Sequence, residues 1–261
     1  MPPLLSIDRL SLSFGGLKAV SEFSLELAPG DLHGLIGPNG AGKTTIFNML
    51  TGVYRPDTGT IHLDGQPLVG LKPHRIACAG LVRTFQNIRL FGDLTALDNV
   101  RVAGCLGLRR TMAGALVRSR RHRIDEARLL GRAHELLDLC RLDHRAQRPA
   151  HALPHGEQRR LEIARALAAE PKVLVLDEPA AGINRQEKRD LADLIERLRR
   201  EHGLTILMIE HDMGVVMNLC RELTVIDYGV TIARGRPEAI QNDPKVVEAY
   251  LGAPDTTEGT P

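Results

Sequence analysis

Residues 37 to 45 read Gly-Pro-Asn-Gly-Ala-Gly-Lys-Thr-Thr, and this stretch decides the fold class of the 261-residue chain. An apolar run, Leu32 to Ile36, precedes it, and a helix-like run, Ile46 to Leu50, follows it. Glycines let backbone N–H groups turn toward anionic oxygens, a lysine adds positive charge, a threonine hydroxyl suits magnesium, and the following helix adds its positive N-terminal end. The stretch predicts a site for the phosphates of ATP or GTP; the alternative is a glycine-rich turn without a ligand. The residues expected at this site are Gly37, Pro38, Asn39, Gly40, Ala41, Gly42, Lys43, Thr44 and Thr45.

The composition is that of a globular protein with an ordinary core, because 43% of the residues are hydrophobic. Lys and Arg total 34 against 32 Asp and Glu, aromatic residues make up 3%, and tryptophan is absent. A chain with so little net charge and so few stacking side chains gives no reason to expect nucleic acid as a partner. No apolar run approaches the roughly 18 residues that span a bilayer, and the first residues do not read as a secretion signal. We therefore expect a chain that is neither secreted nor membrane-spanning.

The four cysteines, Cys78, Cys105, Cys140 and Cys220, are far apart in the sequence and form no CxxC pair. This spacing favours buried, reduced thiols over a disulfide or zinc framework. A cytoplasmic location follows as an expectation.

The order of predicted elements indicates an α/β fold. Alternating apolar residues at 10–14 and 23–27 predict an antiparallel strand pair, and 59–63 predicts another strand. The pattern becomes helical from about 93 to 148. Buried strands are then predicted at 172–176 and 204–209, with a helix at 185–200 between them, as a parallel sheet requires. Residues 246–251 predict a short C-terminal helix, followed by a polar tail.

Two adjacent carboxylates, Asp177 and Glu178, end the apolar strand that begins at Val173. Phosphate-loop NTPases use this arrangement beside the nucleotide. Asp177 is expected in the magnesium shell, and Glu178 is the candidate to accept a proton from the attacking water or to orient that water. The alternative is a strand that ends at an acidic turn.

An amphipathic helix pattern with a glycine at its start runs from Leu153 to Leu167, just ahead of the carboxylates. It resembles the signature segment of ATP-binding cassette (ABC) ATPases, usually written LSGGQ, although Pro154 replaces the common serine and His155 a common glycine. Proline has no hydroxyl that could bind phosphate. Either Gly156 and the following backbone amides at the helix start supply enough hydrogen-bond donors to the anion, or this half of the site is weaker than usual. Without the resemblance, the segment is a capped surface helix. By resemblance, Gly156, Glu157 and Gln158 contact the nucleotide of a partner chain.

Three further motifs follow in that family's order: Thr84 to Asn87, Ala181 to Asn184, and Glu210 to Asp212. By resemblance, Gln86 contacts magnesium or the water and lies on a segment that faces the transmembrane partner, and His211 contacts the terminal phosphate. Phe14 fits the aromatic residue on which the family stacks adenine, although a phenylalanine in the core is the alternative. The motifs together narrow the nucleotide to ATP. The magnesium ligands expected from the resemblance are Thr44, Gln86 and Asp177.

The resemblance covers residues 5–251 and extends below the superfamily. The stretches 83–91, 156–165, 177–184 and 248–252 look like the ATPase subunits of branched-chain amino acid importers, and the insertion at 106–132 is similar to the longer of two paired ATPases. Urea and amide importers and an ATPase of lipopolysaccharide export are close relatives, so cargo stays open. The arginines of the insertion suit either anionic lipid headgroups or a solvated helix face, which Asp125 and Glu126 favour.

The resemblance implies a phosphate-loop NTPase cassette with a RecA-like parallel-sheet core, an N-terminal antiparallel β subdomain and a helical signature subdomain. A single ATPase domain would span 1–261, with its core at about 5–92 and 160–240, the helical subdomain at about 93–159, and a C-terminal helix and tail at about 241–261. The expected ligands are ATP and Mg2+.

The expected partners are a second ABC ATPase subunit, either a paralogue or a second copy, two transmembrane permease subunits and, indirectly, an extracytoplasmic substrate-binding protein, at the cytoplasmic face of the inner membrane. Two rival functions are a soluble cassette protein acting on ribosomes or DNA and a regulator that binds nucleotide without hydrolysing it.

Overall fold

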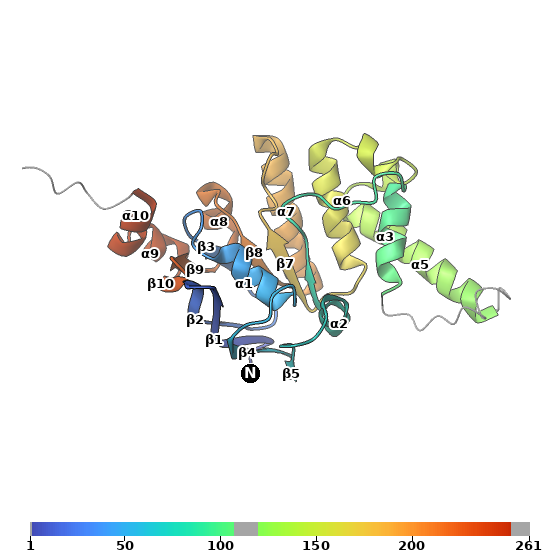
Figure 1. Cartoon of the computed structure of the whole chain (residues 1–261). Coiled ribbons are helices and arrows are strands. Elements are labelled where there is room, and N and C mark those ends of the chain that lie inside the picture. Colours follow the sequence, from blue (N-terminus) through green and yellow to red (C-terminus); the bar gives the residue numbers. More distant parts are fainter. Residues whose placement is uncertain (1, 107–119, 252–261) are drawn as a thin grey trace, which may run out of the picture. The chain divides into compact units, whose positions relative to one another are not determined.

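The computed structural model describes residues 2–106 and 120–251, which divide into two compact units. The first unit takes the described residues up to Pro73 and from Arg199 onward, and the second takes those within His74–Leu198. Each unit contains strands and helices, as the α/β expectation requires (Figure 1).

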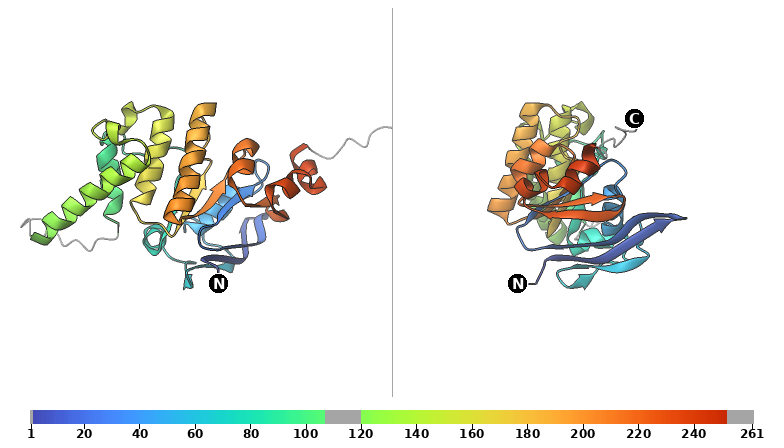
Figure 2. Two further views of the ribbon diagram at one scale, coloured as in Figure 1. Left: turned by 180° about the vertical axis from the view of Figure 1, so that it is seen from behind. Right: turned by 90° about the vertical axis from the view of Figure 1, so that its left-hand side faces the viewer.

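An antiparallel sheet forms the N-terminal part of the first unit. Its strand order is β2 (Leu17–Leu27), β1 (Leu5–Phe14), β4 (Thr58–Leu63) and β5 (Gln66–Pro67). The right-hand view of Figure 2 shows β1 and β2 as a long twisted ribbon. The predicted strand pair and the strand predicted at 59–63 are confirmed.

Parallel strands form the other part of the first unit. Strand β3 (Leu32–Ile36) lies between β8 (Thr205–Ile209) and β9 (Glu222–Asp227) and is parallel to both. Strand β10 (Val230–Gly235) pairs antiparallel with β9. All five residues of β3 and of β8 are buried, which explains their nearly continuous apolar runs. The helices of this part are α1 (Lys43–Leu50), α8 (Met213–Leu219), α9 (Pro237–Gln241) and α10 (Pro244–Leu251).

The second unit contains the parallel pair β6 (Leu81–Arg83) and β7 (Val173–Asp177) together with most of the longer helices. Its helices α3 (Ala96–Gly104), α5 (Arg120–Leu139) and α6 (His155–Leu167) pack together, as both views of the chain from front and back show (Figures 1 and 2). Helix α2 (Pro73–Ala79) begins at the boundary between the units, and α7 (Arg185–His202) ends beyond it. Two short 3-10 segments, Asp143–Arg145 and Ala150–Ala152, connect α5 to α6.

The structure corrects one expectation about the cysteines. All four thiols are free, but Cys78 is exposed and Cys105 half-exposed, so the prediction that all four are buried was wrong. Cys78 lies on α2, a short helix that buries only Ile76, and its side chain falls on the outer face. Burial raises the pKa values of Cys140 and Cys220 to about 12, which keeps these two as protonated thiols.

Within the described part of the chain, every helix is too short or too polar to cross a membrane. Of the arginine-rich insertion, Arg109, Arg110 and Arg118 lie outside the described residues. Arg123 and Arg128 are exposed on α5, and Glu126 forms an ion pair with Arg101 at 2.9 Å. Exposed arginines suit anionic lipid headgroups and a solvated helix face alike, so the role of the insertion stays a prediction.

Candidate nucleotide site

The phosphate loop connects the buried strand β3 to helix α1, the setting predicted for it. Two of its glycines are required by close backbone neighbours. A Cβ atom added to Gly37 would lie 2.0 Å from the carbonyl oxygen of Ile226, and one added to Gly42 would lie 2.7 Å from that of Ala19. Strand neighbours of the first unit therefore fix the course of this loop.

Lys43 is the first residue of α1, and only 7% of it is exposed. Its ammonium group donates to the carbonyl oxygens of Gly37 at 2.6 Å and Pro38 at 2.7 Å, so the positive charge lies inside the loop. The N–H of Gly229 donates to the carbonyl of Ala41 at 2.9 Å and anchors the loop to the β9–β10 turn. Thr44 is exposed and Thr45 half-buried. The loop thus holds a cation and an accessible hydroxyl at one helix start.

A cavity of about 500 Å³ borders the phosphate loop within the first unit. Pro38, Asn39, Gly40 and Ala41 line one side, and the β9–β10 turn and α10 line the rest. Burial raises the pKa of Tyr250 on α10, against the opposing effect of the backbone N–H of Gly37 in the phosphate loop. The sequence analysis missed this contact. The stretch 248–252, which resembles the ATPase subunits of branched-chain amino acid importers, could have pointed to this contact, but the sequence analysis gave it no role.

Phe14 ends β1 with 47% of its surface exposed, and its ring meets that of Tyr54 edge-on at a centroid distance of 5.3 Å. A core role for Phe14, the alternative considered from sequence, is therefore wrong. The exposed ring offers a face to a planar ligand.

His211 follows the end of β8 and is exposed. Because β3 and β8 are parallel neighbours, with Leu35 opposite Ile209, the phosphate loop and His211 leave the same edge of the sheet. The buried carboxylate of Glu210 accepts from the N–H groups of His211 at 3.2 Å and Asp212 at 3.4 Å, and so holds the turn.

The second unit brings Gln86 and Glu178 together. Strands β6 and β7 are parallel, with Arg83 opposite Val175, so both residues lie beyond the carboxyl ends of the two strands. Nε2 of Gln86 donates to Oε2 of Glu178 at 2.7 Å. Glu178 has a φ of 46°, in the left-handed region that a side chain other than glycine rarely adopts. Such strain clusters at functional sites.

Asp177 is 4% exposed and forms an ion pair with Arg83, Nη2 to Oδ2, at 2.5 Å. Two guanidinium groups lie over the Phe85 ring, that of Arg83 at 5.2 Å and that of Arg89 at 4.3 Å from its centroid. The sequence analysis missed Arg83, although it ends the strand that leads into the Gln86 motif. The guanidinium of Arg83 supplies the positive charge that balances the buried Asp177 carboxylate.

Helix α6 begins at the predicted signature segment, without a side-chain cap from Pro154. Pro154 and His155 are exposed, but Gly156 is buried, and a Cβ added there would lie 2.3 Å from Oε1 of Glu187. Glu187 accepts from the N–H of Asn184 at 3.0 Å, while Oδ1 of Asn184 accepts from the N–H of Glu187 at 3.0 Å. This reciprocal pair is a capping box at the start of α7, and it packs against the signature glycine.

The side chains of Glu157 and Gln158 support the start of α6 itself. Glu157 pairs with Arg145 at 3.1 Å, and Gln158 donates to the carbonyl of Leu153 at 2.9 Å. The backbone N–H groups of the first turn carry the helix's capacity to bind an anion.

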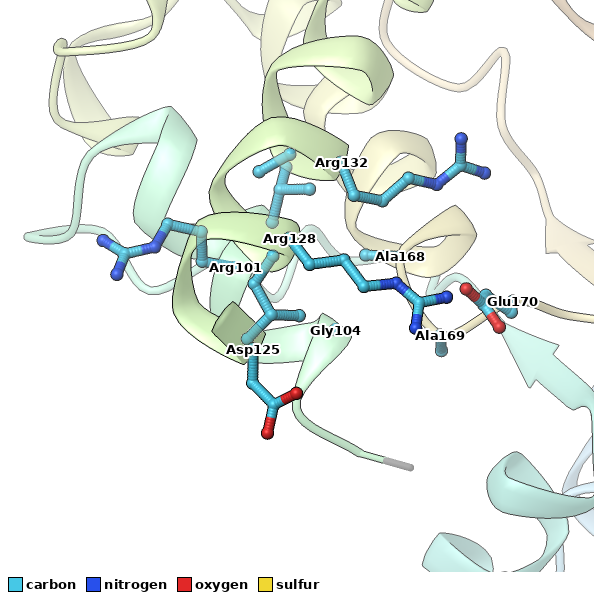
Figure 3. Close-up of a pocket in the computed structure, with 11 residues that line it drawn as sticks. Arg101, Gly104, Asp125, Arg128, Arg132, Ala168, Ala169 and Glu170 are labelled. Atoms are coloured by element: carbon cyan, nitrogen blue, oxygen red, sulfur yellow. The ribbon is translucent and has the colours of Figure 1, made fainter. Parts of the chain in front are cut away.

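A separate cavity of about 210 Å³ lies between α3, α5 and the end of α6 in the second unit (Figure 3). Arg101, Arg128 and Arg132 line it together with Asp125 and Glu170. It contains none of the predicted site residues.

Comparisons with known proteins agree with these motifs. The sequence profile of the ABC transporter family matches residues 20–181, and that of the branched-chain amino acid ATP-binding cassette transporter family matches 230–256. The chain is 47% identical over 250 residues to the high-affinity branched-chain amino acid transport ATP-binding protein LivG of Escherichia coli (strain K12), covering 96% of this chain and 98% of LivG. It is 46% identical to BraF of Pseudomonas aeruginosa (strain PAO1), with the same description and the same coverage.

A solved ATP-binding cassette of an ABC transporter, in its ADP conformation, aligns with a TM-score of 0.83 at 30% identity and covers 97% of this chain and 100% of its own. The fold class expected from the sequence, a cassette with an antiparallel sheet and parallel strands, is thereby confirmed. The chain belongs to the ABC transporter family and is one of its ATP-binding ATPase subunits.

Proposed function

We propose that this chain is the ATP-hydrolysing subunit of an importer of branched-chain amino acids, and that it acts as one cassette domain at the cytoplasmic face of the membrane. The cargo proposal is supported by the names of the relatives at 46–47% identity and by the family profile at 230–256. The partners would be a second cassette, two permease subunits and, outside the cytoplasm, a substrate-binding protein.

Lys43 and the backbone amides of the phosphate loop would bind the β- and γ-phosphates of ATP. The ammonium group already lies inside the loop on two carbonyl oxygens, so a phosphate oxygen can replace these acceptors after a small movement. Phe14 would stack on adenine, and His211 would contact the terminal phosphate.

The side chains proposed for magnesium fit the ion chemically. Thr44 offers a hydroxyl, Asp177 a carboxylate and Gln86 an amide oxygen, and Mg2+ prefers oxygen ligands while it keeps several waters. Arg83 balances the Asp177 carboxylate in this structure, so metal binding would exchange one positive partner for another. Bound Mg2+ supplies neutralisation of the charge on the phosphate oxygens.

One observation carries the proposal of hydrolysis: Nε2 of Gln86 lies 2.7 Å from Oε2 of Glu178 at the ends of adjacent parallel strands. The amide donor orients the carboxylate, which would then act as the base that accepts a proton from water. Phosphoryl transfer needs positioning more than covalent help, and an oriented base is one part of that requirement.

A single cassette would leave the terminal phosphate open on one side. In the proposed complex, Gly156, Glu157 and Gln158 at the start of α6 of one subunit cover the phosphate held by the other, chiefly through N–H groups. Closure of the pair would move the Gln86 segment, on which the permease subunits rest.

Replacement of Glu178 by Gln tests the catalytic assignment. We expect ATP turnover by the complex with its membrane subunits to fall about 10²- to 10⁴-fold, because the general base is removed, while ATP binding persists. Glu201→Gln, an exposed carboxylate at the end of α7, is the matched control and should leave turnover unchanged. Unchanged hydrolysis in Glu178→Gln would remove Glu178 from the mechanism. If the wild-type complex hydrolyses no ATP, a regulator that binds nucleotide without hydrolysing it is favoured instead.

The cargo is tested with the membrane proteins that co-purify with this chain. Reconstituted into vesicles with their binding protein, they should drive ATP-dependent uptake of leucine, isoleucine or valine. Uptake of urea or an amide instead, or ATP-driven extraction of lipopolysaccharide, would replace the cargo proposal and leave the motor assignment intact.

A further inference from the structure

One face of α6 binds the backbone of the Gln86 segment. Arg159 is 6% exposed, and its guanidinium donates to the carbonyl oxygens of two consecutive residues, Phe85 at 3.0 Å and Gln86 at 2.5 Å. A guanidinium carries two parallel N–H groups in a rigid fork, so it can fix both carbonyls at once. Arg159 therefore sets the direction in which the Gln86 side chain leaves the backbone.

Glu162, one turn along α6, completes this attachment. It is 2% exposed, its Oε2 lies 3.6 Å from Nη1 of Arg159, and its Oε1 accepts from the backbone N–H of Phe85 at 3.3 Å. Phe85 is thus held at both its N–H and its C=O by one pair of side chains on one helix. A buried pair of this kind holds a single geometry, because each charge would be costly without the other.

The far end of the same segment is also fixed. Arg165 of α6 donates to the carbonyl of Arg89, and its guanidinium lies 5.9 Å from the centroid of the Phe91 ring. Asn99 of α3, which is fully buried, accepts from the N–H of Phe91 at 2.9 Å and donates to its carbonyl at 3.0 Å. The segment from Phe85 to Phe91 is thus tied to the helices rather than carried as a free loop.

We propose that Arg159, supported by Glu162, is a positioning residue that aims Gln86 at Glu178 and makes the Gln86 segment follow any displacement of α6. The inference rests on the proposed function, in which Gln86 and Glu178 act on the water. The same helix starts in the signature segment, at His155, only four residues before Arg159. A movement of that helix start on binding nucleotide would therefore be passed to the segment that faces the permease, through the hydrogen bonds of Arg159 to Phe85 and Gln86 and of Glu162 to Phe85.

Three variants test the proposal. Arg159→Gln removes the fork and the charge, and Arg159→Lys keeps the charge but cannot bridge two carbonyls. The control is Arg132→Gln, which removes an exposed arginine of the same unit that pairs with Glu135 at 3.0 Å. In the transporter complex we expect kcat to fall on the order of tenfold to a hundredfold in Arg159→Gln and less in Arg159→Lys, with KM for ATP little changed. Arg132→Gln should match the wild type.

A double-variant cycle separates positioning from a general loss of structure. If Arg159 acts through Gln86, Arg159→Gln should lower kcat no further in a Gln86→Ala background. An equal fold-loss in both backgrounds would overturn the proposal.

Hydrogen exchange in the purified chain tests the attachment without any hydrolysis, so it stays informative even if the proposed function fails. Amides of residues 84–92 should exchange at least tenfold faster in Arg159→Gln than in the wild type and Arg132→Gln, because the hydrogen bonds from Arg159 to this segment are lost. Unchanged exchange there would refute the inference. Should Arg159→Gln not fold, Arg159→Lys gives the same readout with a smaller expected change.

Discussion

Two helices of this chain begin at segments proposed to bind phosphate, and they are built differently. Helix α1 starts after a glycine loop that lies between neighbouring strands, and its own first residue, Lys43, places a charge inside that loop. Helix α6 starts after Pro154, with no side-chain cap and no lysine, and its first turn is shaped by Glu187 and Arg145 from elsewhere in the unit. One start carries its chemistry locally, whereas the other depends on tertiary packing.

This difference teaches how a departure from the family's pattern can be tolerated. Pro154 and His155 are exposed, whereas Gly156 is buried against the Glu187 carboxylate. Packing against Glu187 requires a glycine at position 156, and the chain keeps one there. Pro154 and His155, which depart from the family's pattern, face solvent. Changes at α1 should therefore affect ligand binding strongly, and changes at α6 should affect mainly local stability and coupling.

Among changes at the two helix starts, the largest effect is expected at the charge of α1. In Lys43→Ala the loop loses its cation, and ATP turnover of the complex should fall about 10²- to 10³-fold, as when one preorganised donor is removed from an active site. ATP affinity should fall as well, measured by titration with a fluorescent nucleotide. Lys18→Ala, an exposed lysine of β2, is the control. If the two variants behave alike, the phosphate assignment of the loop is wrong.

The next effect concerns the glycine that opens the loop. In Gly37→Ala the new methyl group would meet the backbone carbonyl of Ile226 at 2.0 Å, and a backbone neighbour cannot simply rotate away. We expect the free energy of unfolding to fall by about 3 kcal/mol, at the upper end of overpacking effects. Gly16→Ala, which meets open space in the β1–β2 turn, should change it by less than about 0.5 kcal/mol. Equal urea midpoints would contradict the packing argument.

Acid should weaken the strand that carries the loop of α1. His33 of β3 is 2% exposed, its Nε2 lies 2.8 Å from Oγ1 of Thr224, and burial lowers its pKa from 6.5 to about 4, against the opposing effect of Glu222. The unfolded chain binds the proton more readily, so stability is highest above pH 7 and falls as the pH drops through 6.5 toward 4. Between pH 7 and pH 5 the contribution of His33 amounts to about 2 kcal/mol.

Urea unfolding of the wild type and of His33→Gln at both pH values measures this contribution. The glutamine does not titrate, so the variant should lose about 2 kcal/mol less than the wild type over the same interval. A parallel loss in the two proteins would show that His33 is not the group responsible.

Much of this architecture could be predicted from the sequence, for a physical reason. The strands β3, β7 and β8 are buried on all sides and read as continuous apolar runs, and the phosphate loop and the carboxylates follow directly at their ends. Local sequence therefore identifies Lys43, Asp177 and Glu178 as site residues. The exposure of Cys78 was mispredicted because burial depends on which face of a short helix is covered.

The supporting residues could not be found this way. Arg83, Arg159 and Glu187 act on partners at least 30 positions away in the sequence, so no local pattern indicates them. Arg159 also lies in a run with Arg160, and only the folded chain shows which arginine is buried against the Gln86 segment. Tyr250 reaches the phosphate loop from the C-terminal helix for the same reason.

The smallest effect is expected at the glycine of α6, and it sharpens the contrast with Gly37. In Gly156→Ala the new methyl group meets the end of the Glu187 side chain at 2.3 Å, and a flexible side chain can move. Its displacement would break the hydrogen bond to Asn184 and so weaken the cap of α7, at a cost of about 1 kcal/mol.

Two further variants check this explanation by urea unfolding. Gly131→Ala, on an exposed part of α5 with open space around the position, should instead stabilise the chain by about 0.5 to 1 kcal/mol, because alanine is the better helix former. In a Glu187→Ala background the neighbour is gone, and Gly156→Ala should then add no further loss. If it still destabilises that background by about 1 kcal/mol, the glycine is required by the start of α6 itself, and the two helix starts are more alike than their packing indicates.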